Sequence, residues 1–239
     1  MEAIGSGVPN RRHDQERPMA RPQLSDEVAA HVRELVLTGQ LRAGEFVRVE
    51  KLAEDLGMSI TPVREGLLAL RGEGILTLAP RRGFLVAPLS EQDLLDLFWV
   101  QAQLAGELAA RATPLLDDEQ IAELGELQEK LVTALGEGDL TTVERLNHEF
   151  HRTVNRAAGS TKLAWFLKTA TRYVPLRYYQ RVGGWPDATR HDHFAVLEAF
   201  RARDPEAARA AMVEHIRHAG RLLAAHADLP EDTGDGTTG

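Results

Sequence analysis

Histidines in three C-terminal segments are the residues of this chain whose type and spacing best suit chemistry. The chain holds nine histidines. Asn147 and His151 are four residues apart, so on a helix both side chains leave the same face. His193 and His215 each share a helical face with apolar residues, which predicts that both point into a core. Neutral imidazoles are good ligands for Zn, Ni, Co, Mn or Fe, so these residues are candidates for a divalent-metal site.

Two other interpretations of these histidines stay open at the level of sequence. A core-facing histidine is commonly a hydrogen-bonded core residue, and the three could retain a wet polar cavity. A metalloenzyme is the second alternative, because three histidines with an open coordination position could activate water. That alternative lacks a general base: Glu198 and Glu214 point elsewhere, and no carboxylate falls one turn from the histidines on the inner face. We therefore expect no enzymatic activity.

Polar residues that follow Gly57 form a second constellation, in the order expected of a helix-turn-helix. In that motif the second helix lies in the major groove, and its first residues meet base edges and phosphates. Serine and threonine hydroxyls suit phosphates or bases, and arginine binds guanine or phosphate through two hydrogen bonds. A pair of arginines at a predicted hairpin tip would reach a phosphate or the minor groove. A domain used only for protein contacts is the alternative. The candidate DNA contacts are Ser59, Thr61, Arg64, Arg71, Arg81, Arg82 and Gly83.

Two domains are needed to position these groups. Three helices fit residues 24–72, and residues 75–88 predict a small hairpin, which is the order of a winged helix. From Ser90 onward only helical patterns occur, so the predicted fold is mainly α: a winged helix-turn-helix followed by an all-helical bundle. Pro175 is expected to kink the fourth helix of the bundle. The predicted bundle helices cover about 90–112, 117–136, 139–157, 161–182, 187–202 and 205–226. The predicted domains are a disordered arm (1–22), the winged helix-turn-helix (23–88), a helical effector-binding and oligomerisation domain (89–227) and a disordered tail (228–239).

Composition and charge restrict the partners of these domains. The chain has no cysteine, which excludes disulfides, cysteine-ligated zinc and a thiol nucleophile. It has no apolar run of ~20 residues and no signal-peptide core, so we expect a cytoplasmic protein without a membrane partner. Residues 1–90 hold 12 basic and 12 acidic residues, whereas the remainder holds 16 and 24 and accounts for the net charge of −8. DNA contacts must therefore come from a local basic face of the N-terminal domain.

The segment MSITPVREGLLALRGEGILTLAPRRGFLV resembles the signature of the GntR family of transcription regulators, whose usual form is close to V-S-R-T-P-V-R-E-A-L-x-x-L-x-x-E-G-L. The preceding GQLRAGEFVRVEKLAEDLG is similar to the family's leader, and together they cover about 24–88. The resemblance implies that Thr61 and Arg64 contact DNA. Ile60 stands where the family usually has an arginine that helps to read the operator, and Ala43 replaces a common proline. We therefore expect an operator that differs from the family's usual one.

Three C-terminal motifs, NHEFH (147–151), DHFAVLEAF (192–200) and DPEAARAAMVEHI (204–216), resemble the FCD effector domain of FadR-type GntR regulators. This resemblance covers about 90–226. It implies a divalent metal ion, Zn, Ni or similar, with Asn147, His151, His193 and His215 as ligands. Asn147 stands where aspartate is usual, so the site has one negative charge fewer, and we expect weaker metal binding.

The same resemblance implies a small effector, and the family's metal commonly helps to hold a carboxylate. Many relatives carry arginine and glutamate in the first bundle helix, where this chain has Gln101 and Ala105. Tyr173 and Arg177 share a predicted inner stripe with Phe166 and could substitute for the missing arginine. The predicted effector pocket therefore comprises Gln101, Tyr173 and Arg177.

Taken together, these patterns predict a ligand-responsive, sequence-specific DNA-binding regulator. We expect a repressor that is released or retuned by a small carboxylate-bearing metabolite bound at a metal-containing pocket. Its expected partners are double-stranded operator DNA, the effector and a second copy of the chain, because family members are typically dimers on short palindromic operators. A metal-sensing regulator of the same fold is the alternative function, and a histidine-ligated metalloenzyme is the other.

Overall fold

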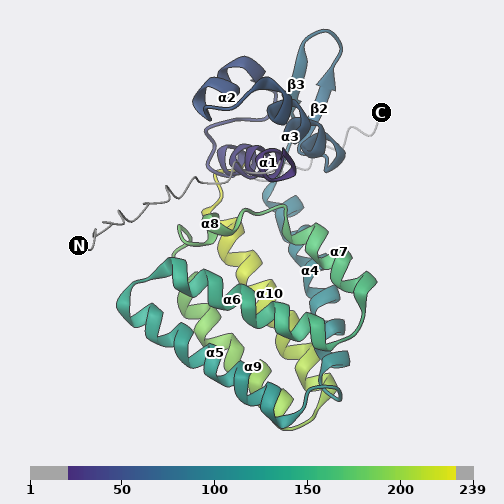
Figure 1. The fold of residues 1–239 in the computed structure, drawn as a ribbon, viewed down its shortest axis with the longest axis vertical. Helices are drawn as coiled ribbons and strands as arrows, with labels where there is room; N and C mark the ends of the chain where they lie inside the picture. Colours follow the sequence, from purple (N-terminus) through teal and green to yellow (C-terminus); the bar gives the residue numbers. More distant parts are fainter. Residues whose placement is uncertain (1–20, 230–239) are drawn as a thin grey trace, which may run out of the picture.

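A computed structural model describes residues 21–229, apart from the side chains of residues 21–23, 176 and 177. This part of the chain is mostly helical with one small sheet (Figure 1), so the predicted mainly α fold is confirmed. The N-terminal elements are α1 (Arg21–Leu37), β1 (Phe46–Val47), α2 (Val49–Asp55), α3 (Ile60–Gly72), β2 (Leu76–Ala79) and β3 (Gly83–Val86). The C-terminal helices are α4 (Glu91–Ala112), α5 (Asp118–Glu137), α6 (Leu140–Ala157), α7 (Thr161–Thr171), α8 (Leu176–Tyr179), α9 (Trp185–Arg201) and α10 (Pro205–His226).

Helices α1 and α3 form the core of the winged domain. Val28, Val63 and Leu67 are fully buried there, because valines and leucines recur at helical spacing on the facing sides of the two helices. The helices cross closely at Gly66, where a Cβ atom would lie 2.7 Å from the carbonyl oxygen of Ser25. A side chain at this position would therefore push α3, the predicted DNA-reading helix, away from α1.

The wing is a three-stranded antiparallel sheet with the order β1-β3-β2. Strands β2 and β3 pair from Leu76 opposite Val86 to Ala79 opposite Gly83, which leaves a three-residue tip. Arg81 and Gly83 both have positive φ, at 64° and 98°, as such a tight tip requires. The hairpin was predicted, but β1 was not, since it has two residues and pairs with residues almost 40 positions later.

The C-terminal helices form a bundle in which α4 and α10 make the most extensive contact. They run in opposite directions, because Gly220 of α10 faces Phe98 near the start of α4, whereas Gly106 faces Val213. Helix α9 packs on α10 and α5, and α6 packs on α5 and α4. Ser90 and Asp93 form the predicted capping box at the start of α4. Within residues 21–229, no helix has the length and apolar character needed to cross a membrane.

The segment predicted as one kinked helix over 161–182 is divided in two. Helix α7 ends at Thr171 and α8 begins after Pro175, because a proline disfavours helical conformation in the residue before it and supplies no N–H. The predicted inner stripe was wrong at Phe166, whose side chain is 55% exposed. The predicted arm and tail lie almost entirely outside the described residues, and α1 already begins at Arg21.

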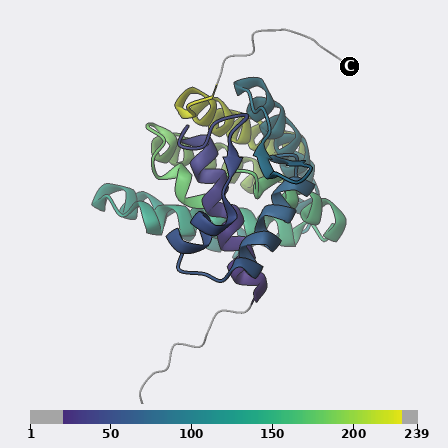
Figure 2. The same cartoon turned by 90° about the horizontal axis from the view of Figure 1, so that it is seen from above.

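The two domains meet at a packed junction below the winged domain in Figure 1, and Figure 2 shows the winged domain lying over the bundle. The hydroxyl of Tyr178 lies 3.4 Å from the carbonyl oxygens of both Leu37 and His226. The backbone N–H of Asp228 also donates to Leu37, and Arg181 forms an ion pair of 2.8 Å with Glu34. Helix α8 and the end of α10 are thus attached directly to α1, so movement in the bundle has a physical route to the DNA-binding domain.

Candidate functional site

Helices α6, α9 and α10 bring three of the predicted metal ligands together inside the bundle. His151, His193 and His215 each offer one ring nitrogen, and these nitrogens all lie within 4.8 Å of one another. The Nε2 atoms of His151 and His215 are 3.1 Å apart. His193 and His215 are buried, whereas His151 is partly exposed. The sequence motifs, which lie on three separate helices, therefore converge on a single place.

Ring packing holds the imidazoles in position. The His193 ring stacks on Phe150 with centroids 4.1 Å apart, and the rings of His151 and His215 lie nearly parallel at 5.1 Å. Phe150 precedes His151 on α6 and is 1% exposed, so the same helix supplies a ligand candidate and an apolar support for another.

Gln128 of α5 orients His193, and the sequence analysis missed it. Its amide nitrogen donates to the carbonyl oxygen of Arg190 at 2.9 Å, so its oxygen faces His193 Nδ1, also at 2.9 Å. We assign the ring proton to Nδ1 on this basis, which leaves the Nε2 lone pair available. Gln128 lies between Leu124 and Leu131 on the buried face of α5, and a glutamine on such a face is a signal that could have identified it.

Asp192 is a carboxylate close to the cluster that the sequence analysis did not identify, because it looked only for a carboxylate one turn from each histidine. Its Oδ2 atom lies 2.9 Å from His218 Nδ1 and 3.5 Å from His215 Nδ1. Its Oδ1 atom lies 3.2 Å from Nδ1 of the exposed His191. The prediction considered spacing within each helix, whereas this contact joins α9 to α10. Glu198 and Glu214 are exposed, as expected.

Burial and neighbouring charges set the protonation states of this site. Desolvation, followed by an unfavourable electrostatic interaction with His215, lowers the pKa of His193 and of His151 well below the usual histidine value. Burial opposes ionisation of Asp192, but its interactions with His215, His191 and His218 outweigh this effect and lower the pKa of Asp192 to about 2. His151 and His193 are therefore neutral and able to bind a cation at pH 7, beside an ionised carboxylate.

Unsatisfied polar atoms concentrate at this place. Among the described side chains, the buried polar atoms without a hydrogen-bond partner include Asn147 Oδ1, His193 Nε2 and His215 Nδ1. Such atoms are uncommon in folded proteins and call for an explanation. A divalent ion would satisfy the first two, and three imidazoles with one amide oxygen suit Zn or Ni. The residues present therefore fit a metal ion.

The predicted effector residues lie toward the junction with the winged domain. Gln101 is buried and donates to the carbonyl oxygen of Ala170 at 3.3 Å, so it ties α4 to α7. Tyr173 packs at the edge of the core that joins the two domains, where desolvation raises its pKa. Arg177 belongs to α8, and its side chain lies outside the described part of the structure.

The candidate DNA contacts lie on α3 and on the wing. Ser59 precedes α3 as its N-cap residue, and Thr61, Arg64 and Arg71 are exposed along it. Arg81 and Arg82 are exposed at the wing tip beside the partly buried Gly83. None of these arginines forms an ion pair with another described residue, so all four are available to phosphates or bases. Ile60, the first residue of α3, is 43% exposed.

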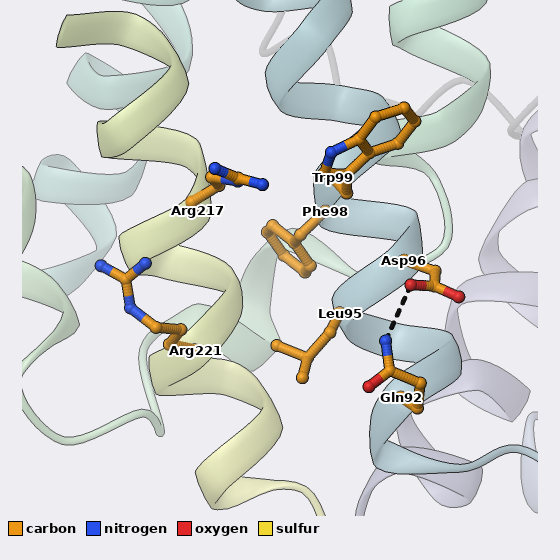
Figure 3. A pocket seen from close by; sticks show the side chains of 7 residues that line it. All are labelled: Gln92, Leu95, Asp96, Phe98, Trp99, Arg217 and Arg221. Atoms are coloured by element: carbon orange, nitrogen blue, oxygen red, sulfur yellow. Dashed lines mark hydrogen bonds between the residues drawn. The ribbon is translucent and has the colours of Figure 1, made fainter. Parts of the chain in front are cut away.

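A groove of about 290 Å³ runs between α4 and α10 on the outer surface of the bundle. Figure 3 shows Leu95, Phe98 and Trp99 beside this groove, with Asp96 on the α4 side and Arg217 and Arg221 on the α10 side. Trp99 is 51% exposed. The groove thus combines an exposed aromatic surface with opposite charges on its two walls, and the three histidines do not line it.

Comparison with known proteins accounts for both domains. The profile of the FCD domain matches residues 96–218, and the profile described as bacterial regulatory proteins of the gntR family matches residues 24–86. The two matches correspond to the helical bundle and to the winged domain, in the order found in the structure.

Individual relatives are regulators. The chain is 29% identical to the HTH-type transcriptional regulator McbR of Escherichia coli over 82% of this chain and 90% of that protein. It is also 29% identical to a probable D-xylose utilization operon transcriptional repressor of Paenarthrobacter nicotinovorans, over 79% and 85%. A solved structure of McbR from E. coli superimposes with a TM-score of 0.63 at 27% identity, covering 84% of this chain and 96% of that one.

Proposed function

The chain belongs to the GntR family of DNA-binding transcription regulators and carries an FCD domain, and from this premise we propose that it represses genes in response to a small carboxylate-bearing metabolite. The observation that best supports this is the combination of free arginines on α3 and the wing with a buried cluster of neutral histidines in the bundle. In this proposal the protein acts in the cytoplasm. The arginines of the winged domain bind DNA, and the histidines of the bundle hold a cation together with its anionic ligand.

We propose Thr61, Arg64, Arg71, Arg81 and Arg82 as the operator contacts, with Ser59 and Gly83 beside them. Phosphate contacts supply affinity that depends on salt, and base contacts supply sequence preference. Because Ile60 is exposed and apolar, it would contact a thymine methyl group or no base at all, whereas an arginine would select guanine.

We propose His151, His193 and His215 as the ligands of a divalent ion, with Asn147 as a weaker fourth ligand. Such an ion supplies positive charge and open positions for a carboxylate. The chain's own residues prepare the site: Gln128 holds the proton on His193 Nδ1, and Phe150 supports the ring from one side. Gln101, Tyr173 and Arg177 remain our candidates for the remote part of the effector.

We propose that the chain acts as a homodimer through the groove between α4 and α10. A two-fold axis parallel to these helices would place α4 of one copy on α10 of the other. Asp96 would then face Arg217 and Arg221 of the second copy, and Trp99 would be covered. An isologous interface must be complementary to itself, and this surface carries both charges around an apolar centre.

Sedimentation of variants tests the dimer. We expect Asp96→Arg to weaken the dimer and Asp96→Arg combined with Arg217→Asp to restore part of it, because the second change re-creates opposite charges across the axis. Trp165→Ala, at an exposed position on α7, is the control and should leave the dimer intact. A dimer that is unaffected by Asp96→Arg and by Trp99→Glu would place the interface elsewhere.

Selection of operator sequences from randomised DNA, with and without added Zn or Ni, tests the regulatory function. We expect enrichment of a short palindrome that requires Arg64. Enrichment only in the presence of metal, without any organic ligand, would favour the alternative of a metal-sensing regulator. Failure to enrich any sequence under either condition would contradict the proposal.

A further inference from the structure

Asp192 contacts the histidine cluster but is not one of the three residues whose ring nitrogens converge. It is on α9, one residue before His193, and its side chain is 13% exposed. Its Oδ2 atom faces α10, 2.9 Å from His218 Nδ1 and 3.5 Å from His215 Nδ1. The carboxylate therefore lies behind His215, on the side of the ring opposite to Nε2, which faces His151.

The cluster itself has no negative charge. The group of His151, His193 and His215 contains no carboxylate, and the neighbouring Asn147 offers only a neutral amide oxygen. A dication held by four neutral groups in a buried site would lack a counter-charge, which is strongly unfavourable in a low-dielectric interior. Asp192 supplies a partly buried negative charge that is separated from the binding position by a single imidazole ring.

The position of the ring proton on His215 also depends on Asp192. His215 Nδ1 is buried and has no hydrogen-bond partner, and the Asp192 carboxylate is the group facing it. If Nδ1 carries the proton and donates it to Asp192, the Nε2 lone pair is directed at the cluster. A hydrogen bond from a ligand histidine to a carboxylate fixes the tautomer and the ring orientation and makes the ring a better donor.

We propose that Asp192 is the positioning residue of the metal site: it holds His215 in the Nδ1–H tautomer and supplies the counter-charge that the four ligands lack. The inference rests on the proposed metal binding. Gln128 has the equivalent place behind His193, but as a neutral partner. The site is thus supported from two sides, by an amide on α5 and by a carboxylate on α9, and only the second changes the charge of the site.

Metal affinity of the full chain tests the inference. Competition between the protein and a chelating indicator gives the dissociation constant for Zn and for Ni. We expect Asp192→Asn to bind about 10- to 100-fold more weakly than the wild type, the usual effect of removing a carboxylate behind a ligand histidine. We expect Asp192→Glu to retain most of the affinity. Asp187→Asn is the matched control, because Asp187 is an exposed aspartate on the same helix, 70% exposed and paired with Arg190.

The exchange rate of the His215 ring N–H proton is a second measurement, and a general loss of packing would not change it selectively. In the Co(II)-loaded protein, ring N–H protons of ligand histidines give shifted NMR signals that disappear when they exchange with solvent. We expect the wild type and Asp192→Glu to show slowly exchanging signals from His193 and His215. In Asp192→Asn the His215 signal should exchange faster, while the His193 signal, held by Gln128, persists.

The outcomes separate the two levels of the proposal. A wild-type chain that binds none of these metals would overturn the metal site, and the role of Asp192 with it. A wild-type chain that binds metal with the same affinity as Asp192→Asn, and with unchanged His215 exchange, would overturn the role of Asp192 alone. If Asp192→Asn does not fold, Asp192→Glu is compared with the wild type, and a loss of metal affinity of about tenfold or more with unchanged exchange of the His215 proton would contradict the role of Asp192.

Discussion

At the scale of single residues, a histidine's neighbours decide what it does. His148 and His151 are three positions apart on α6, yet His148 is exposed and His151 faces two other imidazoles. The motifs predicted which histidines turn inward, because helical periodicity specifies a face. They did not reveal Gln128 and Asp192, since each acts across an interface between two helices. The direct ligand candidates are therefore visible in the sequence, and the residues that orient them become visible only after folding.

Replacement of His193 tests the metal site directly. We expect His193→Ala to lose bound metal, because it removes one of three imidazoles and its buried Nε2 atom, whereas His148→Ala on the exposed face of α6 should retain it. Metal content after dialysis against a low concentration of Ni, measured by plasma mass spectrometry, gives the comparison. Equal metal content in the two variants would show that the ion binds elsewhere.

The lowered pKa values of His151 and His193 predict how the stability of the metal-free protein depends on pH. Their pKa values are below that of histidine in the unfolded chain, about 6.5, so below that pH the unfolded state binds more protons and stability falls. Above about pH 6.5 neither state binds a proton at these groups, and the effect is absent.

Urea unfolding of the chelated protein between pH 8 and pH 5 measures this dependence. We expect a flat region above pH 6.5 and then a loss of up to about 1.4 kcal/mol per pH unit for each histidine. Asp192 does not contribute in this range, because its pKa of about 2 places its loss of charge below pH 4. His193→Gln should reduce the slope, and an unchanged slope would contradict the assignment.

At the scale of elements, the observed bounds match the predicted ones most closely for helices that have clear capping residues and a regular apolar periodicity. Helix α10 spans the predicted residues 205–226, because Asp204 caps it and Pro205 suits the first position. The break between α7 and α8 was not predicted, because the apolar pattern continues through Pro175 while the backbone does not. Strand β1 was not predicted, because a strand of two residues shows no periodicity and its partner strand is distant in sequence.

The close contact between α4 and α10 at Gly220 leads to a prediction about the stability of the protein. A Cβ atom at Gly220 would lie 2.6 Å from Phe98, so we expect Gly220→Ala to reduce the free energy of unfolding by about 1–3 kcal/mol. Gly136 near the end of α5 has no neighbour within 4 Å, and Gly136→Ala should add about 0.5–1 kcal/mol. Chemical denaturation distinguishes the two, and a neutral Gly220→Ala would argue against this close packing.

Helix α3 carries the prediction for DNA binding. We expect Arg64→Ala to lower operator affinity by about 1–3 kcal/mol if Arg64 contacts a base, or to reduce the salt dependence by about one charge if it contacts a phosphate. Arg156→Ala, at an exposed position on α6, should do neither. Fluorescence anisotropy over a range of salt concentrations measures both quantities. Binding that is indifferent to Arg64 would remove α3 from the interface.

At the scale of the whole molecule, the histidine cluster and the winged domain lie apart, and a packed junction joins the two domains. Tyr178 and Asp228 connect the bundle to the end of α1, and α1 packs on α3. A ligand that shifts α10 through His215 therefore acts on the helix whose C-terminal end contacts the winged domain. Only differential binding of the effector to two arrangements of this junction would change operator affinity.

The most direct test of the account is operator affinity measured in the presence of Ni or Zn against a panel of small carboxylates. We predict that at least one carboxylate lowers the affinity of the wild-type chain by about tenfold or more, a coupling of about 1.4 kcal/mol. The same carboxylate should have no effect on His193→Ala, although that variant still binds the operator through Arg64. An operator affinity that is identical for wild type and His193→Ala with every metal and carboxylate tested would contradict the account.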